Sequence, residues 1–137
     1  MAKTALIVDD IAFARKLIKD ILTAAKYTVI AEAADGDEAV KLFEKYKPDF
    51  VTMDIVMPHK GGIEATRQIL DRNKDARIII VSAMGHEQIL MDAINAGARD
   101  YLLKPFSPDD LLKAVEKVLK EEDQEPGASK GVPHGAP

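Results

Sequence analysis

The chain has 137 residues, 47% of them apolar, which is enough for one domain with a single hydrophobic core. It contains no cysteine, which excludes disulfides, thiolate metal sites and a cysteine nucleophile, and fits a reducing compartment. Its formal charge of -4 comes without a basic block, so by itself the chain is a poor binder of nucleic acid or of membrane surfaces.

The first expected element is residues 5–8, an apolar run without polar alternation, as in a central parallel strand buried on both faces. Two aspartates, Asp9 and Asp10, follow it directly. We expect no signal peptide and no membrane span, and therefore a cytoplasmic protein, because no apolar run approaches bilayer length. Helical spacing then predicts a helix with this apolar face: Ala14, Leu17, Ile18, Ile21, Leu22 and Ala25.

Residues 28–34 are the second expected strand, and Glu32 within it indicates a position near the edge of the sheet. The following helix begins at Gly36. It must end near Lys47, because the residue before Pro48 is disfavoured in a helix.

The second half of the chain continues the alternation of apolar runs and amphipathic periodicity. The expected elements are strands at 50–53, 77–81 and 100–103, with helices starting near 63, 89 and 108. Gly97 suits a left-handed helix cap, and Ser107 with Pro108 marks a helix start. Five strand-helix units predict an α/β fold, a doubly wound parallel sheet with helices on both faces.

The composition changes at Glu121, since the final 17 residues hold three of the eight glycines and three of the seven prolines. We therefore expect a domain at residues 1–120 and a disordered tail at 121–137. The tail is interpreted as a linker or remnant without function. The alternative is a tether to an output domain.

Polar side chains follow four of the strands, and parallel strands bring their carboxyl ends to one edge of the sheet. They are Asp9 and Asp10 after the first strand, Asp54 after the third, Ser82 after the fourth and Lys104 after the fifth. Three carboxylates about 5 Å apart repel by about 3 kcal/mol per pair in a partly polar environment, so they need a counter-charge. All-oxygen ligands favour Mg²⁺.

Each residue also has a simpler interpretation. Asp9 or Asp10 could cap the first helix, Ser82 could be a turn residue, and Lys104 could be a solvated lysine. Four strand ends with compatible polar groups favour a site instead. The three histidines share no metal-ligand spacing and are expected at the surface: His59, His86 and His134.

The joint spacing of five motifs over residues 4–120 resembles response-regulator receiver domains, closest to the single-domain chemotaxis regulators. The motifs are Val8-Asp9-Asp10, Met53-Asp54-Ile55-Val56-Met57-Pro58, Ser82-Ala83, Ala96-Gly97-Ala98 and Tyr101-Leu102-Leu103-Lys104-Pro105-Phe106. The resemblance implies a flavodoxin-like fold, with five parallel strands in the order 2-1-3-4-5 and five helices. It also implies a cis bond between Lys104 and Pro105.

The resemblance implies a role for each site residue. Asp54 is the phosphoacceptor, Asp10 a direct Mg²⁺ ligand, Asp9 a ligand largely through water, Val56 a ligand through its backbone carbonyl, and Ser82 and Lys104 bind the phosphoryl oxygens. The donor would be a phosphohistidine on a sensor histidine kinase. The domain would catalyse its own phosphorylation and a slow self-dephosphorylation, and would not be an enzyme for another substrate. We expect slow decay because the apolar side chains of Val56 and Met84 flank the phosphoryl group in this arrangement.

Phosphorylation would draw Ser82 inward and let Tyr101 rotate into the vacated space. The face formed by the fourth helix, fifth strand and fifth helix would then bind an output protein, such as a flagellar motor switch. A separate phosphatase would be needed for a fast response. The alternative is the receiver of a longer regulator whose output domain is absent from this chain.

Two rival classes are disfavoured. A haloacid-dehalogenase-type phosphatase needs a second aspartate two residues after the first, where this chain has Val56. A flavodoxin needs a phosphate-binding first loop, and Asp9 with Asp10 would repel a phosphate.

Overall fold

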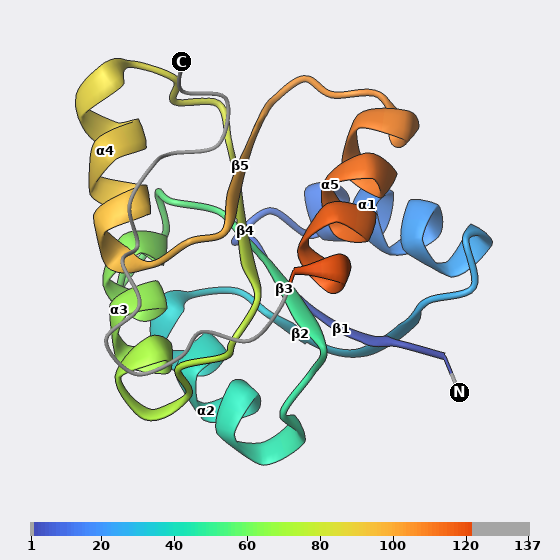
Figure 1. Cartoon of the computed structure of the whole chain (residues 1–137), viewed down its shortest axis with the longest axis horizontal. Helices are drawn as coiled ribbons and strands as arrows, with labels where there is room; N and C mark the ends of the chain where they lie inside the picture. Colours follow the sequence, from blue (N-terminus) through green and yellow to red (C-terminus); the bar gives the residue numbers. More distant parts are fainter. Residues whose placement is uncertain (1, 122–137) are drawn as a thin grey trace.

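The computed structural model describes residues 2–121, in which one parallel sheet carries helices on both faces (Figure 1). The strands are β1 (Thr4–Val8), β2 (Thr28–Ala33), β3 (Phe50–Met53), β4 (Ile78–Ser82) and β5 (Asp100–Leu103). The helices are α1 (Ala12–Ala24), α2 (Gly36–Tyr46), α3 (Gly62–Arg72), α4 (Glu87–Ala96) and α5 (Pro108–Lys120). The strand order is β2-β1-β3-β4-β5, so the predicted fold class and order are confirmed.

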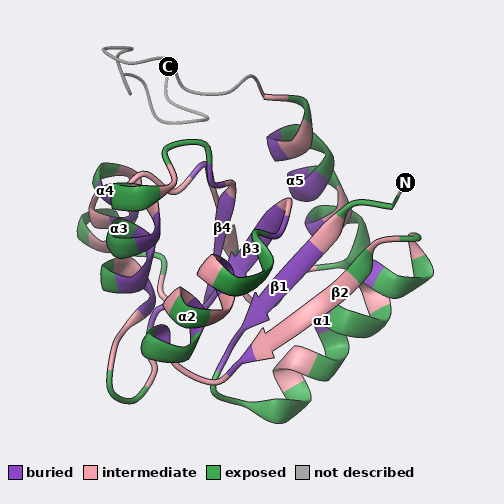
Figure 2. Cartoon of the chain, turned by 90° about the horizontal axis from the view of Figure 1, so that it is seen from below, coloured by how far each residue is buried: buried purple, intermediate pink, exposed green. Residues whose placement is uncertain are grey.

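Two apolar clusters fill the space on either side of the sheet, because successive residues of a strand point to opposite faces. Leu6 and Val8 of β1 join the cluster under α2, α3 and α4, whereas Ala5 and Ile7 join the cluster under α1 and α5. Figure 2 shows β1 and β4 as largely buried strands, with exposed residues on the outer sides of the helices and in the loops. Burial on both faces explains why these strands show no polar alternation.

The edge strands and α1 depart from this pattern of complete burial. β2 lies at the edge, as Glu32 indicated, and Glu32 pairs there with Arg15 of α1 at 3.3 Å. Leu17, which the helical spacing placed on the apolar face, is 48% exposed. In α1 only Ile18 and Leu22 are fully buried, because the helix covers the margin of the sheet.

The helix ends follow the expected local chemistry. The carboxylate of Asp35 accepts the N–H of Glu38 at the start of α2, and α2 ends before Lys47, which adopts a left-handed conformation. Gly97 caps α4 with φ 103°, as predicted. Ser107 caps α5 in a reciprocal hydrogen-bonded pair with the backbone and side chain of Asp110.

Two arginines hold the carboxyl end of α5. Arg77, just before β4, donates to the carbonyls of Val118 and Glu121, both at 2.8 Å. The buried Arg99 pairs with the carboxylate of Glu121 at 3.6 Å. Glu121, the first residue of the expected tail, therefore contacts the packed domain. The rest of that tail, with His134, lies outside the described residues.

No helix within residues 2–121 combines the length and the apolar character needed to cross a membrane.

Candidate functional site

Three carboxylates meet at the carboxyl edge of the sheet. Asp9 and Asp10 follow β1, Asp54 follows β3, and these two strands are hydrogen-bonded neighbours. One carboxylate oxygen from each aspartate lies within 4.8 Å of the other two. Asp9 and Asp54 are buried and Asp10 is exposed, so the group opens to solvent on one side. Such a group could hold a metal ion, and hard divalent cations prefer its oxygen ligands.

Asp9 and Asp10 differ in the use of their oxygens. Asp9 is only 1% exposed, and its Oδ1 accepts the N–H of Ile11 at 2.9 Å while its Oδ2 accepts Nζ of Lys104 at 2.8 Å. Within the part of the chain that the structure describes, Asp10 has no side-chain hydrogen bond or ion pair, which leaves it open to a cation. The N-cap of α1 is Ile11 without a side-chain cap, so the helix-capping alternative is wrong.

The carboxylate of Asp54 lies between a hydrogen-bond donor and a cation. Its Oδ1 accepts the N–H of Ile55 at 2.7 Å, and its Oδ2 lies 3.6 Å from Nζ of Lys104. Burial raises the pKa of Asp54 and the charge of Asp9 adds to this, while the Ile55 N–H and Lys104 oppose it without cancelling it. The ionised form of Asp54 is therefore less favoured than that of a fully exposed aspartate.

Lys104 reaches the acidic group from the end of β5. Burial alone would lower the pKa of Lys104, but the hydrogen bond to Asp9 and the charge of Asp54 outweigh burial and raise it. The ammonium therefore stays charged at neutral pH. The prediction that Lys104 belongs to this edge is confirmed, the solvated-lysine alternative is wrong, and the bond to Pro105 is cis as predicted.

Ser82 and Tyr101 both bind the backbone of Met84 in the loop between β4 and α4. The buried hydroxyl of Ser82 accepts the N–H of Met84 at 3.2 Å. The hydroxyl of Tyr101 donates to the carbonyl of Met84, and the half-buried ring packs against the cluster under α4. One loop residue thus connects the two residues that the sequence assigned to a switch.

The loop after Asp54 contains the features that sequence reasoning missed. A Cβ on Gly62 would lie 1.8 Å from the carbonyl oxygen of Asp54, so only glycine lets α3 pack this closely against the Asp54 backbone. Lys60, which has no sequence pattern to mark it, lies 2.9 Å from Oδ1 of Asp37 in α2. Val56 is 65% exposed in this loop. His59 and His86 are exposed, as expected.

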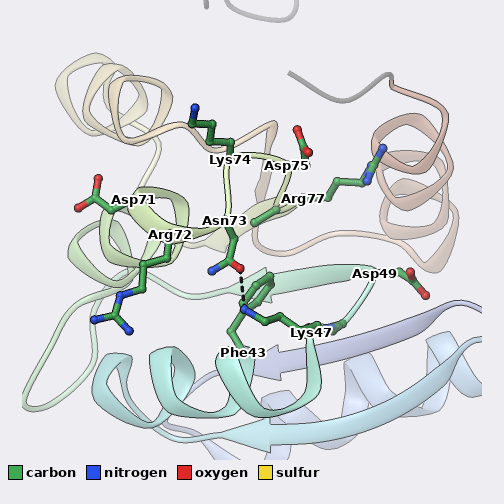
Figure 3. Close-up of a pocket in the computed structure, with 11 residues that line it drawn as sticks. Phe43, Lys47, Asp49, Asp71, Arg72, Asn73, Lys74, Asp75 and Arg77 are labelled. Atoms are coloured by element: carbon green, nitrogen blue, oxygen red, sulfur yellow. Dashed lines mark hydrogen bonds between the residues drawn. The ribbon is translucent and has the colours of Figure 1, made fainter. Parts of the chain in front are cut away.

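A second concave region lies at the opposite end of the sheet (Figure 3). It encloses about 510 Å³ between the end of α2 and the loop before β4. Figure 3 shows the charged side chains of Arg72, Lys74 and Asp49 pointing in different directions, and Lys47 bonded to Asn73 at 2.8 Å. Because these groups do not converge on a common point, the acidic edge remains the candidate site.

We expect Asp54→Asn to stabilise the metal-free protein at neutral pH by about 1 kcal/mol. Because the folded-state pKa of Asp54 is raised, the folded state binds this proton more tightly than the unfolded chain does. Ionisation therefore lowers stability as pH rises from the unfolded pKa through the folded pKa. Urea denaturation with a chelator should show the gain at pH 7 and none below the unfolded pKa. Equal stability at pH 7 would contradict this account.

A doubly wound parallel sheet with an acidic group and a lysine at the carboxyl ends of its strands defines a class, the flavodoxin-like α/β domains with a site at that edge. Within this class the chain matches one particular family. The family model described as "Response regulator receiver domain" matches residues 5–116, and the chain belongs to this family. The resemblance seen in the sequence motifs is confirmed.

Relatives and solved structures agree with this membership. The chain is 48% identical over 120 residues to "Chemotaxis protein CheY" of Thermotoga maritima, covering 88% of this chain and 100% of that protein. It is 49% identical over 119 residues to "Chemotaxis protein CheY" of Bacillus subtilis, covering 87% and 99%. A chain in the crystal structure of the CheX-CheY-BeF3-Mg+2 complex from Borrelia burgdorferi has a TM-score of 0.84 at 36% identity, covering 87% and 90%.

Proposed function

We propose that the chain is a phosphorylation-dependent switch of a two-component system of the chemotaxis type. It takes a phosphoryl group from a phosphohistidine of a sensor histidine kinase onto Asp54 and then binds an output partner. The observation that carries this proposal is the position of Asp54, whose carboxylate belongs to a group that could hold a metal ion and lies 3.6 Å from Nζ of Lys104. An acceptor carboxylate needs both counter-charges.

The residues at the acidic edge fit Mg²⁺. Asp10 is exposed without a protein partner among the described residues, and Asp54 is buried beside the charge of Asp9, where a bound cation would favour its ionised form. Asp10, Asp54 and the carbonyl of Val56 would hold the ion directly, and Asp9 largely through water. When bound, Mg²⁺ would supply charge to the phosphoryl oxygens. The Borrelia complex contains Mg²⁺ and BeF3 with a similar fold, which supports this assignment.

The residues of the chain would contribute by orienting the acceptor carboxylate and binding the phosphoryl group. The Ile55 N–H orients the Asp54 carboxylate through Oδ1. Its other oxygen would attack phosphorus as the bond from phosphorus to the histidine nitrogen breaks and the imidazole keeps the electron pair. Lys104 and Ser82 bind the phosphoryl oxygens. Val56 is exposed at the rim and cannot hydrogen-bond a water there, so the phosphoryl group would be lost slowly, and a phosphatase would speed its removal.

The switch would operate through Met84. Drawing the Ser82 hydroxyl towards a phosphoryl group would release the Met84 N–H and move the carbonyl that Tyr101 now binds. The output partner, such as a flagellar motor switch protein, would bind α4, β5 and α5, where Met91 and Leu103 are exposed. The alternative, a receiver within a longer regulator, uses the same site. In either case the protein would act in the cytoplasm.

The test is labelling with a small phosphodonor, acetyl phosphate, followed by intact-mass spectrometry. We expect one phosphoryl group per chain when Mg²⁺ is present at micromolar to millimolar concentration, and none with a chelator. Asp54→Asn should abolish labelling, whereas Asp71→Asn on the exposed side of α3 should not change it. Metal-dependent labelling of Asp54→Asn at full extent would overturn the assignment.

A further inference from the structure

Lys60 joins the loop that follows Asp54 to two helices. Its backbone carbonyl accepts the N–H of Gly36 at 2.9 Å, at the first residue of α2. Its ammonium lies 2.9 Å from Oδ1 of Asp37 and donates to Oε1 of Gln68 in α3. The side chain is only 16% exposed, although it belongs to a surface loop. Lys60 therefore holds the loop against α2 and α3 instead of extending into solvent.

The contact between Lys60 and α2 is close and complementary in charge. A Cβ on Gly36 would lie 2.5 Å from the carbonyl oxygen of Lys60 and 2.7 Å from its Cγ, so α2 approaches the loop through a glycine. The hydrogen bond from Lys60 holds the pKa of Asp37 below its usual range. Asp37 is therefore ionised at neutral pH, and the ion pair is complete.

The outer part of this loop has few other polar attachments among the described residues. Its apolar anchor there is Met57, which packs against the cluster under α2, α3 and α4. The ends of the loop are joined by the hydrogen bond from the Gly62 N–H to the carbonyl of Ile55 at 2.9 Å, and the backbone N–H of Lys60 donates to the carbonyl of Pro58 at 2.7 Å. Among the residues that the structure describes, Val56 makes no hydrogen bond and is 65% exposed. Lys60 thus ties this outer segment to α2 and α3 through polar contacts, in addition to the apolar packing of Met57.

We propose that Lys60 is a positioning residue for the metal site, because it holds the backbone of Val56 at the rim beside Asp54. The inference rests on the proposed function, since the position of the Val56 carbonyl matters only if a cation binds there. Lys60 makes no contact with the three carboxylates among the described residues. It acts through the loop backbone, as outer groups that orient metal ligands do.

The test compares Mg²⁺ binding and phosphorylation in Lys60→Met and in a matched control, Lys16→Met. Lys16 forms an exposed ion pair with Asp20 on α1, far from this loop. We expect Lys60→Met to weaken Mg²⁺ binding by about tenfold, measured by calorimetry. Labelling at saturating Mg²⁺ should stay close to the wild-type rate. Lys16→Met should leave both unchanged.

Two further variants separate positioning from stability. Asp37→Asn keeps Lys60 and removes its ionic partner, and Gly36→Ala displaces the loop without changing any charge. Both should weaken Mg²⁺ binding, and Lys60→Arg should restore part of it. A change in melting temperature with unchanged Mg²⁺ affinity in all these variants would overturn the inference. Wild-type protein that binds no Mg²⁺ would instead overturn the proposed function.

Discussion

Replacing Lys104 with methionine should slow Mg²⁺-dependent phosphorylation of Asp54 by about a hundredfold and destabilise the metal-free protein by about 3 kcal/mol. Methionine keeps the apolar stem but removes the ammonium that lies 2.8 Å from Oδ2 of Asp9. Asp9 is 1% exposed, so its charge would remain buried with no cation beside it. The same substitution removes the cation that would bind the phosphoryl oxygens at Asp54.

The loss of stability should depend on pH in a defined direction. The pKa of Lys104 is raised in the folded state, so its contribution is complete below the ordinary lysine pKa and is lost as pH rises through the folded value. The difference in free energy of unfolding should therefore shrink only in strongly alkaline solution. Lys117→Met breaks the partly exposed pair with Asp100, whose two charged atoms are 3.6 Å apart, and should change stability by less than about 1 kcal/mol. Equal effects of the two substitutions would contradict this account.

Gly62→Ala should slow phosphorylation of Asp54 by about a hundredfold, because the backbone of the acceptor itself must move. The added Cβ would lie 1.8 Å from the carbonyl oxygen of Asp54 and 2.8 Å from its carbonyl carbon, and backbone atoms cannot swing aside as side chains do. Overpacking of this kind also destabilises by about 1 to 3 kcal/mol.

Gly61→Ala is the matched control for this substitution. A Cβ on Gly61 meets only the carbonyl oxygen of Ile55, at 3.1 Å, and its φ of -75° suits any residue. Compared with Gly61→Ala, the Gly62→Ala protein should be labelled by acetyl phosphate much more slowly and should melt at a lower temperature. A Gly62→Ala protein that is labelled at the wild-type rate would show that the contact relaxes without moving Asp54.

Much of the fold follows from local sequence signals. The predicted bounds of β3 and β5 are the observed ones. Burial between two helix layers explains the continuous apolar sequence of β3, whereas β5 is a half-buried edge strand that was bounded by the Lys104-Pro105 pair after it. Gly97 and Ser107 placed helix ends, since a left-handed cap and an N-cap hydroxyl each have a direct backbone reason. The helical spacing placed Leu17 on the apolar face of its helix, yet Leu17 is 48% exposed. Periodicity identifies the face of a helix, whereas the burial of that face depends on how far the neighbouring sheet extends.

The sequence predicted which residues lie at the site but not which of them contact one another. Parallel strands had to bring Asp9, Asp54 and Lys104 to one edge, and they do. The sequence could not show that Lys104 bonds to Asp9, because that pairing depends on side-chain reach across β3 and β4. Repulsion among three carboxylates indicated a missing cation, and the structure shows that Lys104 supplies part of that charge.

The loop contacts of Lys60 and Gly62 had no local signal. A lysine after a proline in a surface loop is ordinarily solvated, and its partner Asp37 lies in a helix that precedes it by a full strand. Likewise, the distance from Gly62 to Asp54 depends on how α3 docks against β3, which is a tertiary property. Such contacts can be predicted only when the positions of α2 and α3 relative to the loop are known.

The arginines at the carboxyl end of α5 have a practical consequence for optical assays. Arg77 and Arg99 hold Glu121 near the start of β4, at the end of the sheet opposite Asp54. β1 also begins at that end, since the strands are parallel. A fluorescent reporter joined after Glu121 would therefore start about a strand length from the acidic edge, which is about 15 Å for a short strand. The attachment point would therefore lie away from the three carboxylates and Lys104.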